Sequence, residues 1–103
     1  IPNHIDIVYV MSYNIAVKNL VWDEEKNIRL KKERSIGFDD VFDILMRDQF
    51  LDVIKNPSKN FPNQQVFVVK INNYIYYIPF VEDTDNVYLK TIIPSRRASK
   101  KYL

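Results

Sequence analysis

The clearest hydrophobic pattern in the chain predicts an amphipathic helix that begins near residue 38. Apolar residues recur there at spacings of three and four, with aspartates between them. The apolar members are Phe38, Val41, Phe42, Leu45 and Met46. This spacing is that of an α-helix with one apolar face. Gly37, the only glycine of the chain, is its candidate N-cap, and the apolar face requires a sheet to cover.

A second helix is predicted over residues 23–34, mainly from the signals at its two ends. Asp23 is a candidate N-cap, and Glu24 and Glu25 follow in the first turn, where negative charge suits the helix dipole. The last turn carries the cations Lys31, Lys32 and Arg34. Its apolar face consists only of Ile28 and Leu30, so this helix is expected at the surface, against the sheet.

Alternating apolar and polar residues predict strands in most of the remaining chain. The predicted strands cover residues 1–19, 50–55, 66–71, 74–81 and 87–93. Asn72 and Asn73 form a two-residue turn that tolerates positive φ, which predicts a hairpin. Pro79 has no N–H to donate, so it predicts a bulge or a sheet edge near the end of its strand.

The order of these elements predicts one α+β domain over residues 1–103. Ser95 is the candidate N-cap of a short basic helix at the C-terminus, so the order is β-α-α-β-β-β-β-α. The second half is expected to form an antiparallel meander, with the first two helices on one face of the sheet. Residues 1–19 are expected to be a strand-like extension. Met11 is an alternative natural start, which would leave residues 1–10 as upstream sequence.

The composition excludes several kinds of chemistry. The chain has no cysteine, which excludes disulfides and thiolate catalysis, and its only histidine is His4. A histidine-based triad or paired histidine ligands are therefore excluded from the main body, and no metal or cofactor is expected. Any catalysis must use Lys, Arg, Tyr, Glu or Asp. No apolar run approaches the ~20 residues that span a bilayer, so a soluble, cytoplasmic protein without membrane contact is expected.

Positive charge is concentrated near the C-terminus. The net charge is only +2, but the last fourteen residues, KTIIPSRRASKKYL, contain five cations and no acid. The five are Lys90, Arg96, Arg97, Lys100 and Lys101. A strand that leads into a dense cationic helix is suited to holding phosphate groups. Further cations lie in residues 26–34, whereas acids gather in residues 39–52 and 82–85.

Five short motifs follow one another between residues 20 and 103, and as an ordered set they resemble the BrnT-type toxins of bacterial type II toxin–antitoxin systems. The motifs are Trp22-Asp23, Lys26-Asn27, Ile36-Gly37-Phe38-Asp39-Asp40, Phe80-Val81-Glu82 and Pro94-Ser95-Arg96-Arg97-Ala98-Ser99. The resemblance implies a small RelE-like fold, with an antiparallel sheet, two helices packed on one face and a short basic C-terminal helix. It also implies an endoribonuclease that cleaves mRNA without a metal, either free or ribosome-associated.

The same resemblance implies a partner. A cognate antitoxin with a ribbon-helix-helix or similar DNA-binding domain would block the toxin, and operator DNA would be bound only through that antitoxin. Two departures leave an alternative open. Residues 64–66 lack an arginine that the family often has, and residues 34–37 lack a histidine. The alternative is a noncatalytic RNA-binding or partner-binding module that descends from such a toxin.

Arg96 and Arg97 are the first candidates for contact with the reacting phosphate. The guanidinium group binds phosphate oxygens bidentately and suits the charge of a phosphorane transition state. Adjacent residues on a helix point about 100° apart, so the two side chains are not expected to face one phosphate together. The alternative is that both charges are solvated or face a partner protein.

Glu82 and Tyr102 complete the candidate catalytic set. Glu82 follows a strand and matches a glutamate of the family, which suggests a general base, although Asp83 and Asp85 beside it also fit a solvated acidic turn. Tyr102 lies within the basic tail, where it could stack on a base or donate a proton. The candidate RNA-binding cations are Lys90, Lys100, Lys101, Lys31, Lys32 and Arg34.

Two of these assignments have structural alternatives. Lys90 shares its parity with Tyr88 and Ile92, so it lies on their face of the last strand unless that strand bulges. It is either a groove-facing cation or a lysine that protects a sheet edge. The cations of residues 31–34 also suit the C-terminal end of a helix dipole without any ligand.

Overall fold

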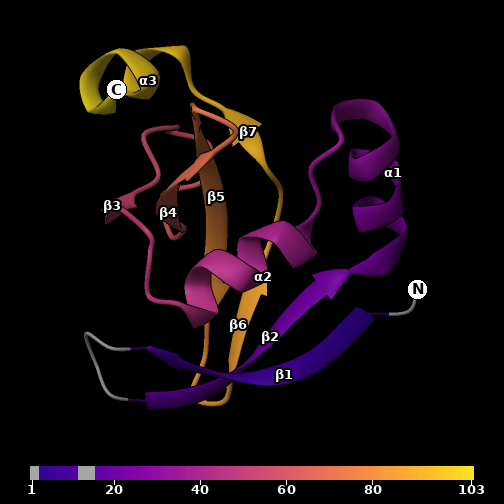
Figure 1. Cartoon of the computed structure of the whole chain (residues 1–103). Helices are drawn as coiled ribbons and strands as arrows, with labels where there is room; N and C mark the ends of the chain where they lie inside the picture. Colours follow the sequence, from indigo (N-terminus) through magenta and orange to yellow (C-terminus); the bar gives the residue numbers. More distant parts are fainter. Residues whose placement is uncertain (1–2, 12–15) are drawn as a thin grey trace.

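The computed structural model describes the backbone of residues 3–11 and 16–103, and the side chains of residues 18–103 (Figure 1). The first half contains β1 (Asn3–Met11), β2 (Ala16–Asp23), α1 (Glu24–Arg34), α2 (Phe38–Met46) and β3 (Asp52–Lys55). The second half contains β4 (Gln65–Ile71), β5 (Tyr74–Glu82), β6 (Asn86–Leu89), β7 (Ile93–Pro94) and α3 (Arg96–Tyr102). The predicted small α+β class is confirmed.

One sheet joins the strands in the order β1-β2-β6-β5-β4-β3, and β7 continues along β5 beyond the end of β6. The meander from β3 to β6 is antiparallel, as predicted, and Asn72 and Asn73 form its hairpin turn with φ of 52° and 62°. However, β2 and β6 are parallel. The sheet is therefore mixed, because the long segment between these two strands returns the chain to the same end of the sheet.

The N-terminal segment is not a single strand. β1 and β2 are separate strands that pair antiparallel, and β2 extends to Asp23. Because β2 also pairs with β6, it is an interior strand of the sheet and not an extension of it. Alternation identifies extended chain, but it does not indicate where the chain reverses. Residues 1–2 and 12–15 of the predicted extension lie outside the described residues.

Different helices cover the two faces of the sheet. α2 crosses one face with α1 beside it, and α3 lies at one end of the other face (Figure 1). β4 shows the alternation directly. Phe67 and Val69 belong to the core beneath α2, whereas Val66 and Val68 belong to a second apolar cluster that includes Ala98 of α3. The strands near α3 are consequently buried on both sides, which makes this end of the sheet a rigid support.

Most of the predicted helical core positions are correct, with two exceptions. Phe38, Val41 and Leu45 of α2 are buried, but Met46 at the last residue of the helix is 44% exposed. On α1, Leu30 is buried whereas Ile28 is 53% exposed. Positions 28 and 30 are about 200° apart on a helix, so both could not face the sheet. The single apolar face predicted for α1 is therefore wrong.

The junction between α1 and α2 depends on a buried amide. Asn27 is 6% exposed, and its Oδ1 accepts a 2.6 Å hydrogen bond from the Phe38 N–H. Gly37, the predicted N-cap of α2, donates its N–H to Asp40 Oδ2 at 2.8 Å. A Cβ at position 37 would lie against Asn27 Oδ1 and 2.8 Å from Asp39 Oδ1. Gly37 is therefore required by a close approach of the two helices.

Gly37→Ala is expected to destabilise the protein by about 1–3 kcal/mol, because the added methyl displaces Asn27 from the Phe38 N–H. Urea denaturation measures this change. Gln49→Ala, an exposed position just beyond α2, serves as the control and is expected to change stability by less than about 0.5 kcal/mol. Equal stability of the two variants would contradict the close contact.

The predicted irregularity at Pro79 is present as a bulge in the strand opposite. Phe80 pairs with Leu89, but Tyr77 pairs with Ile93, so two residues of β5 face three residues, 90–92, of the return strand. Pro79 cannot donate to the ladder, although its carbonyl accepts from the Lys90 N–H at 2.8 Å. The extra residue ends β6, and it changes which side chains of residues 90–93 face the core.

Candidate functional site

Helix α3 is attached to the sheet by its own cap and by a buried serine. Ser95, the predicted N-cap, accepts from the Ala98 N–H through its Oγ at 3.1 Å. Ser99 is 8% exposed, and its Oγ accepts from the Ile75 N–H at 2.9 Å. The Ser95 N–H in turn donates to the Ile75 carbonyl at 2.9 Å. Both backbone groups of Ile75 therefore hold α3 in one position.

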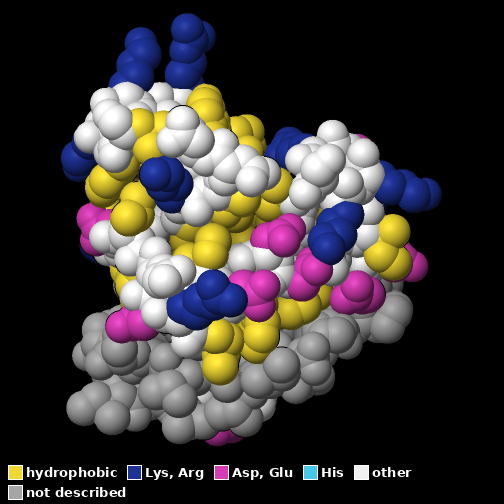
Figure 2. All heavy atoms as spheres, viewed as in Figure 1, with side chains coloured by type: hydrophobic (Ala, Val, Ile, Leu, Met, Phe, Trp, Pro, Cys, Tyr) yellow, Lys and Arg dark blue, Asp and Glu magenta, His cyan; other side chains and the backbone are white. Residues whose placement is uncertain are grey.

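The opposite side of α3 is basic and solvent-exposed. Its four cations are Arg96, Arg97, Lys100 and Lys101. With about 100° per residue, these positions fall within one arc of the helix, away from buried Ala98 and Ser99. Long basic side chains project from this end of the molecule with no acidic side chain between them, whereas acids gather over α2 and α1 (Figure 2). We call Arg96, Arg97, Lys100 and Lys101 the α3 basic face.

Arg96 and Arg97 border one shallow depression together with Lys100. The sequence predicts that the two arginines diverge, because neighbours on a helix point about 100° apart. Their long side chains nevertheless reach the same concave surface. The depression therefore combines three cations from successive turns of one short helix, which is an arrangement suited to a phosphate group.

Tyr102 lies between the α3 basic face and the sheet. Its ring is half-buried against the Val66 and Val68 cluster, and its hydroxyl donates to Asp52 Oδ2 at 3.3 Å. Lys101 Nζ is 5.3 Å from the centre of the ring. The predicted proximity of Tyr102 to cations is confirmed. Its side chain is oriented by Asp52 at the edge of β3, a contact with no signal in the sequence.

Glu82 is far from the α3 basic face. It ends β5, whereas α3 is attached at Ile75, seven residues earlier and about 23 Å away along a strand. Strand alternation also places Glu82 on the α2 side of the sheet, with Phe80. Its carboxylate is paired with Lys18 at 2.8 Å. Glu82 and the two arginines therefore do not form one site.

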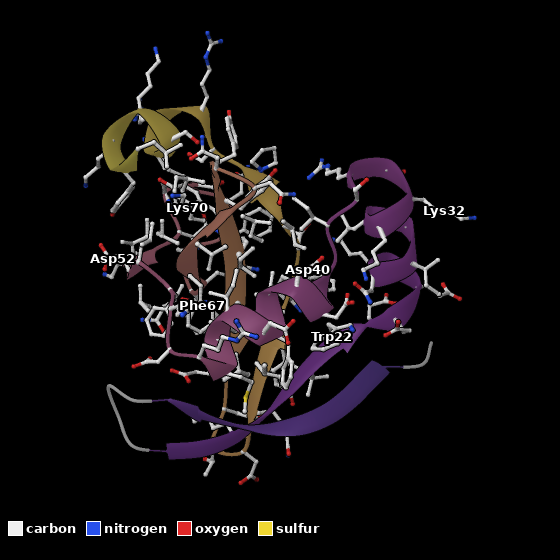
Figure 3. The ribbon with its side chains drawn as sticks, viewed as in Figure 1. Trp22, Lys32, Asp40, Asp52, Phe67 and Lys70 are labelled. Atoms are coloured by element: carbon white, nitrogen blue, oxygen red, sulfur yellow. The ribbon has the colours of Figure 1, made fainter. Side chains whose placement is uncertain are left out.

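The predicted RNA-binding cations of α1 are also separated from one another. Lys31 Nζ contacts Asp39 Oδ2 at 2.5 Å, and this hydrogen bond raises the pKa of Lys31. Lys32 projects away from the rest of the molecule (Figure 3). Arg34 turns the other way, and its Nη1 donates to the Ile92 carbonyl at 2.6 Å. Only Arg34 therefore approaches the C-terminal segment.

A pocket of about 670 Å³ opens at the bulge in the β5 ladder. Its floor crosses three adjacent strands, because Val21 of β2 pairs with Tyr88 of β6 and Pro79 lies on the same face of β5. Phe61 and Ile93 at its rim are 50% and 44% exposed. The pocket therefore combines an apolar floor with an apolar rim.

Two lysines line the same pocket. Lys90 lies in the bulge and is exposed, and Lys26 of α1 is half-buried. Burial lowers the pKa of Lys26, and the positive charges of Arg29, Lys90 and Arg34 lower it further, while Asp23 raises it. Three cations therefore repel the charge of Lys26, and an anion in the pocket would relieve that repulsion.

Lys90 lies in the bulge, which is the exception named in its prediction. It lies outside the strands, and Ile92, expected on the same face, is 1% exposed in the core beneath α2. The bulge breaks the alternation that grouped them. Lys26, Phe61 and Pro79 were not predicted as site residues. The available signal was Pro79 within an otherwise regular strand, since a bulge often accompanies a functional site.

The described part of the chain contains no cluster of three or more His, Asp or Glu side chains that could hold a metal ion. No helix among the described residues has the length and hydrophobicity needed to cross a membrane. Comparisons of the chain with family models, with curated proteins and with solved structures found no match.

Proposed function

We propose that this protein is the toxin of a type II toxin–antitoxin pair and that it binds and cleaves mRNA in the cytoplasm. The α3 basic face carries the proposal. Four cations without an acid between them are displayed on a helix that Ser95, Ala98 and Ser99 attach to a buried strand. Phosphate contacts dominate the affinity of proteins for nucleic acid, so a rigid basic face favours RNA as the ligand.

The proposed chemistry is cleavage by the 2′-hydroxyl of the RNA itself. Arg96 and Arg97 would hold the phosphate oxygens, because both border the same depression and a guanidinium group binds phosphate oxygens bidentately. Tyr102 at the end of α3 and Asp52 at the start of β3 are joined by a hydrogen bond and would act as the acid and the base. In this scheme Glu82 has no catalytic part and forms a salt bridge with Lys18 at the far end of β5.

The proposed antitoxin would cover the α3 basic face. An acidic segment of the partner would compete with RNA for the same four cations, which explains how one protein could silence the other. Operator DNA would be bound by the antitoxin and not by this chain. The resemblance to toxins, described from the ordered motifs, is what suggests this partner.

A noncatalytic RNA-binding module is the second candidate. The observation in its favour is the separation of Glu82 from the arginines, which leaves the basic face without a carboxylate from that position. The toxin proposal also includes a RelE-like arrangement of the fold. Binding is common to both candidates, so the two differ only in the cleavage step.

The purified protein is expected to cleave labelled single-stranded RNA in the presence of EDTA. Gel analysis should show fragments that end in 2′,3′-cyclic phosphate or 3′-phosphate, as internal attack by the 2′-hydroxyl requires. Expression without the antitoxin is expected to arrest growth. A gel shift with intact RNA at every protein concentration would reject the toxin proposal in favour of the binding module.

A further inference from the structure

We infer that the pocket at the bulge opposite Pro79 binds one nucleotide unit of an RNA chain, with its base on the apolar floor and its phosphate between Lys26 and Lys90. The inference rests on the proposed RNA function, and it adds a second contact point separate from the α3 basic face. The pocket and α3 are lined by different residues, and no member of the α3 basic face contributes to the pocket.

The floor of the pocket has the shape and composition that a planar base requires. Val21 and Tyr88 are cross-strand partners, and Pro79 lies on the same face of β5, two residues from Val81, the partner of Tyr88. Phe61 and Ile93 are exposed at the rim. Bases without partners stack readily on aromatic and apolar side chains, and such contacts tolerate any base.

The polar side of the pocket has the charge that a phosphate requires. Lys90 enters from the bulge and Lys26 from α1, and both line the same cavity. Arg34 reinforces this arrangement, because its hydrogen bond to the Ile92 carbonyl ties the end of α1 to the bulge. Asp23 is the acid in the lining, and its carboxylate is already occupied by the Glu25 and Lys26 backbone N–H groups.

The size of the pocket agrees with this occupant. Small-molecule sites in proteins range from about 300 to 1,000 Å³, and the volume here, about 670 Å³, lies within that range. Amide and hydroxyl groups of Asn56, Ser58 and Gln64 also line it and could contact base edges or ribose. A nucleotide uses both kinds of surface, whereas a free phosphate would use only the lysines.

The test is a titration of the whole protein with adenosine 5′-monophosphate, monitored by isothermal titration calorimetry. The ring of Trp22, the only tryptophan of the chain, is buried against Phe38 and Phe42. The heat of binding therefore measures occupancy of the pocket more directly than tryptophan emission would. A saturable change is expected, and Lys90→Gln should weaken binding by about tenfold, as loss of one charge-assisted hydrogen bond would. Arg47→Gln, which removes one charge at the end of α2, should bind as the wild type does.

Parallel titrations with inorganic phosphate and with adenosine distinguish the two halves of the site. Each is expected to bind at least about tenfold more weakly than the nucleotide, because each fills half of the pocket. The inference is overturned if phosphate binds as tightly as the nucleotide, if no saturable change occurs, or if Lys90→Gln binds with unchanged affinity.

The outcome also separates this inference from the proposed function. A variant lacking both Arg96 and Arg97 should still bind adenosine 5′-monophosphate, because neither residue lines the pocket. Nucleotide binding by a protein that leaves RNA intact would retain the pocket and reject the toxin. Cleavage of RNA by a protein that does not bind the nucleotide would retain the toxin proposal and reject the pocket.

Discussion

Replacement of both Arg96 and Arg97 by glutamine is expected to reduce RNA cleavage by at least about 100-fold. Each charge-assisted hydrogen bond to a phosphate contributes about 1.5–3 kcal/mol, and two such losses raise the barrier by at least about 3 kcal/mol. The side chains are exposed and border a solvent-filled depression, so the fold should tolerate the change. Initial cleavage rates of labelled RNA in EDTA measure the effect, and growth in the absence of the antitoxin should recover.

The matched control removes two charges elsewhere. Arg47→Gln/Lys59→Gln lowers the net charge by the same amount, at the end of α2 and in the loop after β3. Because salt-dependent attraction depends on charge near the bound strand, this variant should cleave within about threefold of the wild type. Equal losses in the two double variants would indicate general electrostatic attraction and reject the α3 basic face as the site. Undiminished cleavage by the arginine variant would reject it too.

Ser99→Ala is expected to have the second largest effect, through the position of α3. The substitution leaves the buried Ile75 N–H without its acceptor, which costs about 1–3 kcal/mol. For a domain of this size the melting temperature should fall by about 4–8 °C for each kcal/mol. α3 should also become more mobile, since Ser99 connects it to β5. Thermal denaturation and hydrogen exchange at the Ile75 amide measure both effects.

Thr84→Ala is the control for this substitution. It also removes one hydroxyl, but from an exposed turn, so stability should change by less than about 0.5 kcal/mol. RNA binding by Ser99→Ala should weaken even at temperatures where the protein is folded, because the basic face is no longer held in one orientation. An Ile75 amide that exchanges as slowly as in the wild type would show that Ser99 does not anchor α3.

Local structure was largely predictable from the sequence, because it depends on neighbours in the chain. Asp23 and Ser95 begin their helices, and both side chains accept backbone N–H groups of the first turn. Asn72 and Asn73 make the hairpin turn with positive φ. The prediction failed where a long alternating segment reversed direction, since β1 and β2 have the same pattern that a single strand would have.

The presence of an irregularity near Pro79 was predictable from the sequence, but its effect on the neighbouring side chains was not. A proline without an N–H interrupts the ladder wherever it lies in a strand. The position of the extra residue depends on contacts between segments more than 60 residues apart. As a result, Ile92 lies in the core, whereas Lys90 lines a pocket with Lys26. Parity alone grouped Lys90 with Ile92, and one added residue reversed that grouping.

The amino-acid sequence alone establishes which chemical groups the protein can use. It has no cysteine and only His4 as a histidine, and it places an acid-free set of cations at its C-terminal end. Which of these groups share a surface depends on the folding of the whole chain. It brought Arg96, Arg97 and Lys100 to one depression and moved Glu82 to the far end of β5, paired with Lys18. Composition and local pattern are properties of the sequence itself, whereas segments far apart in the chain come close together only when the sheet forms.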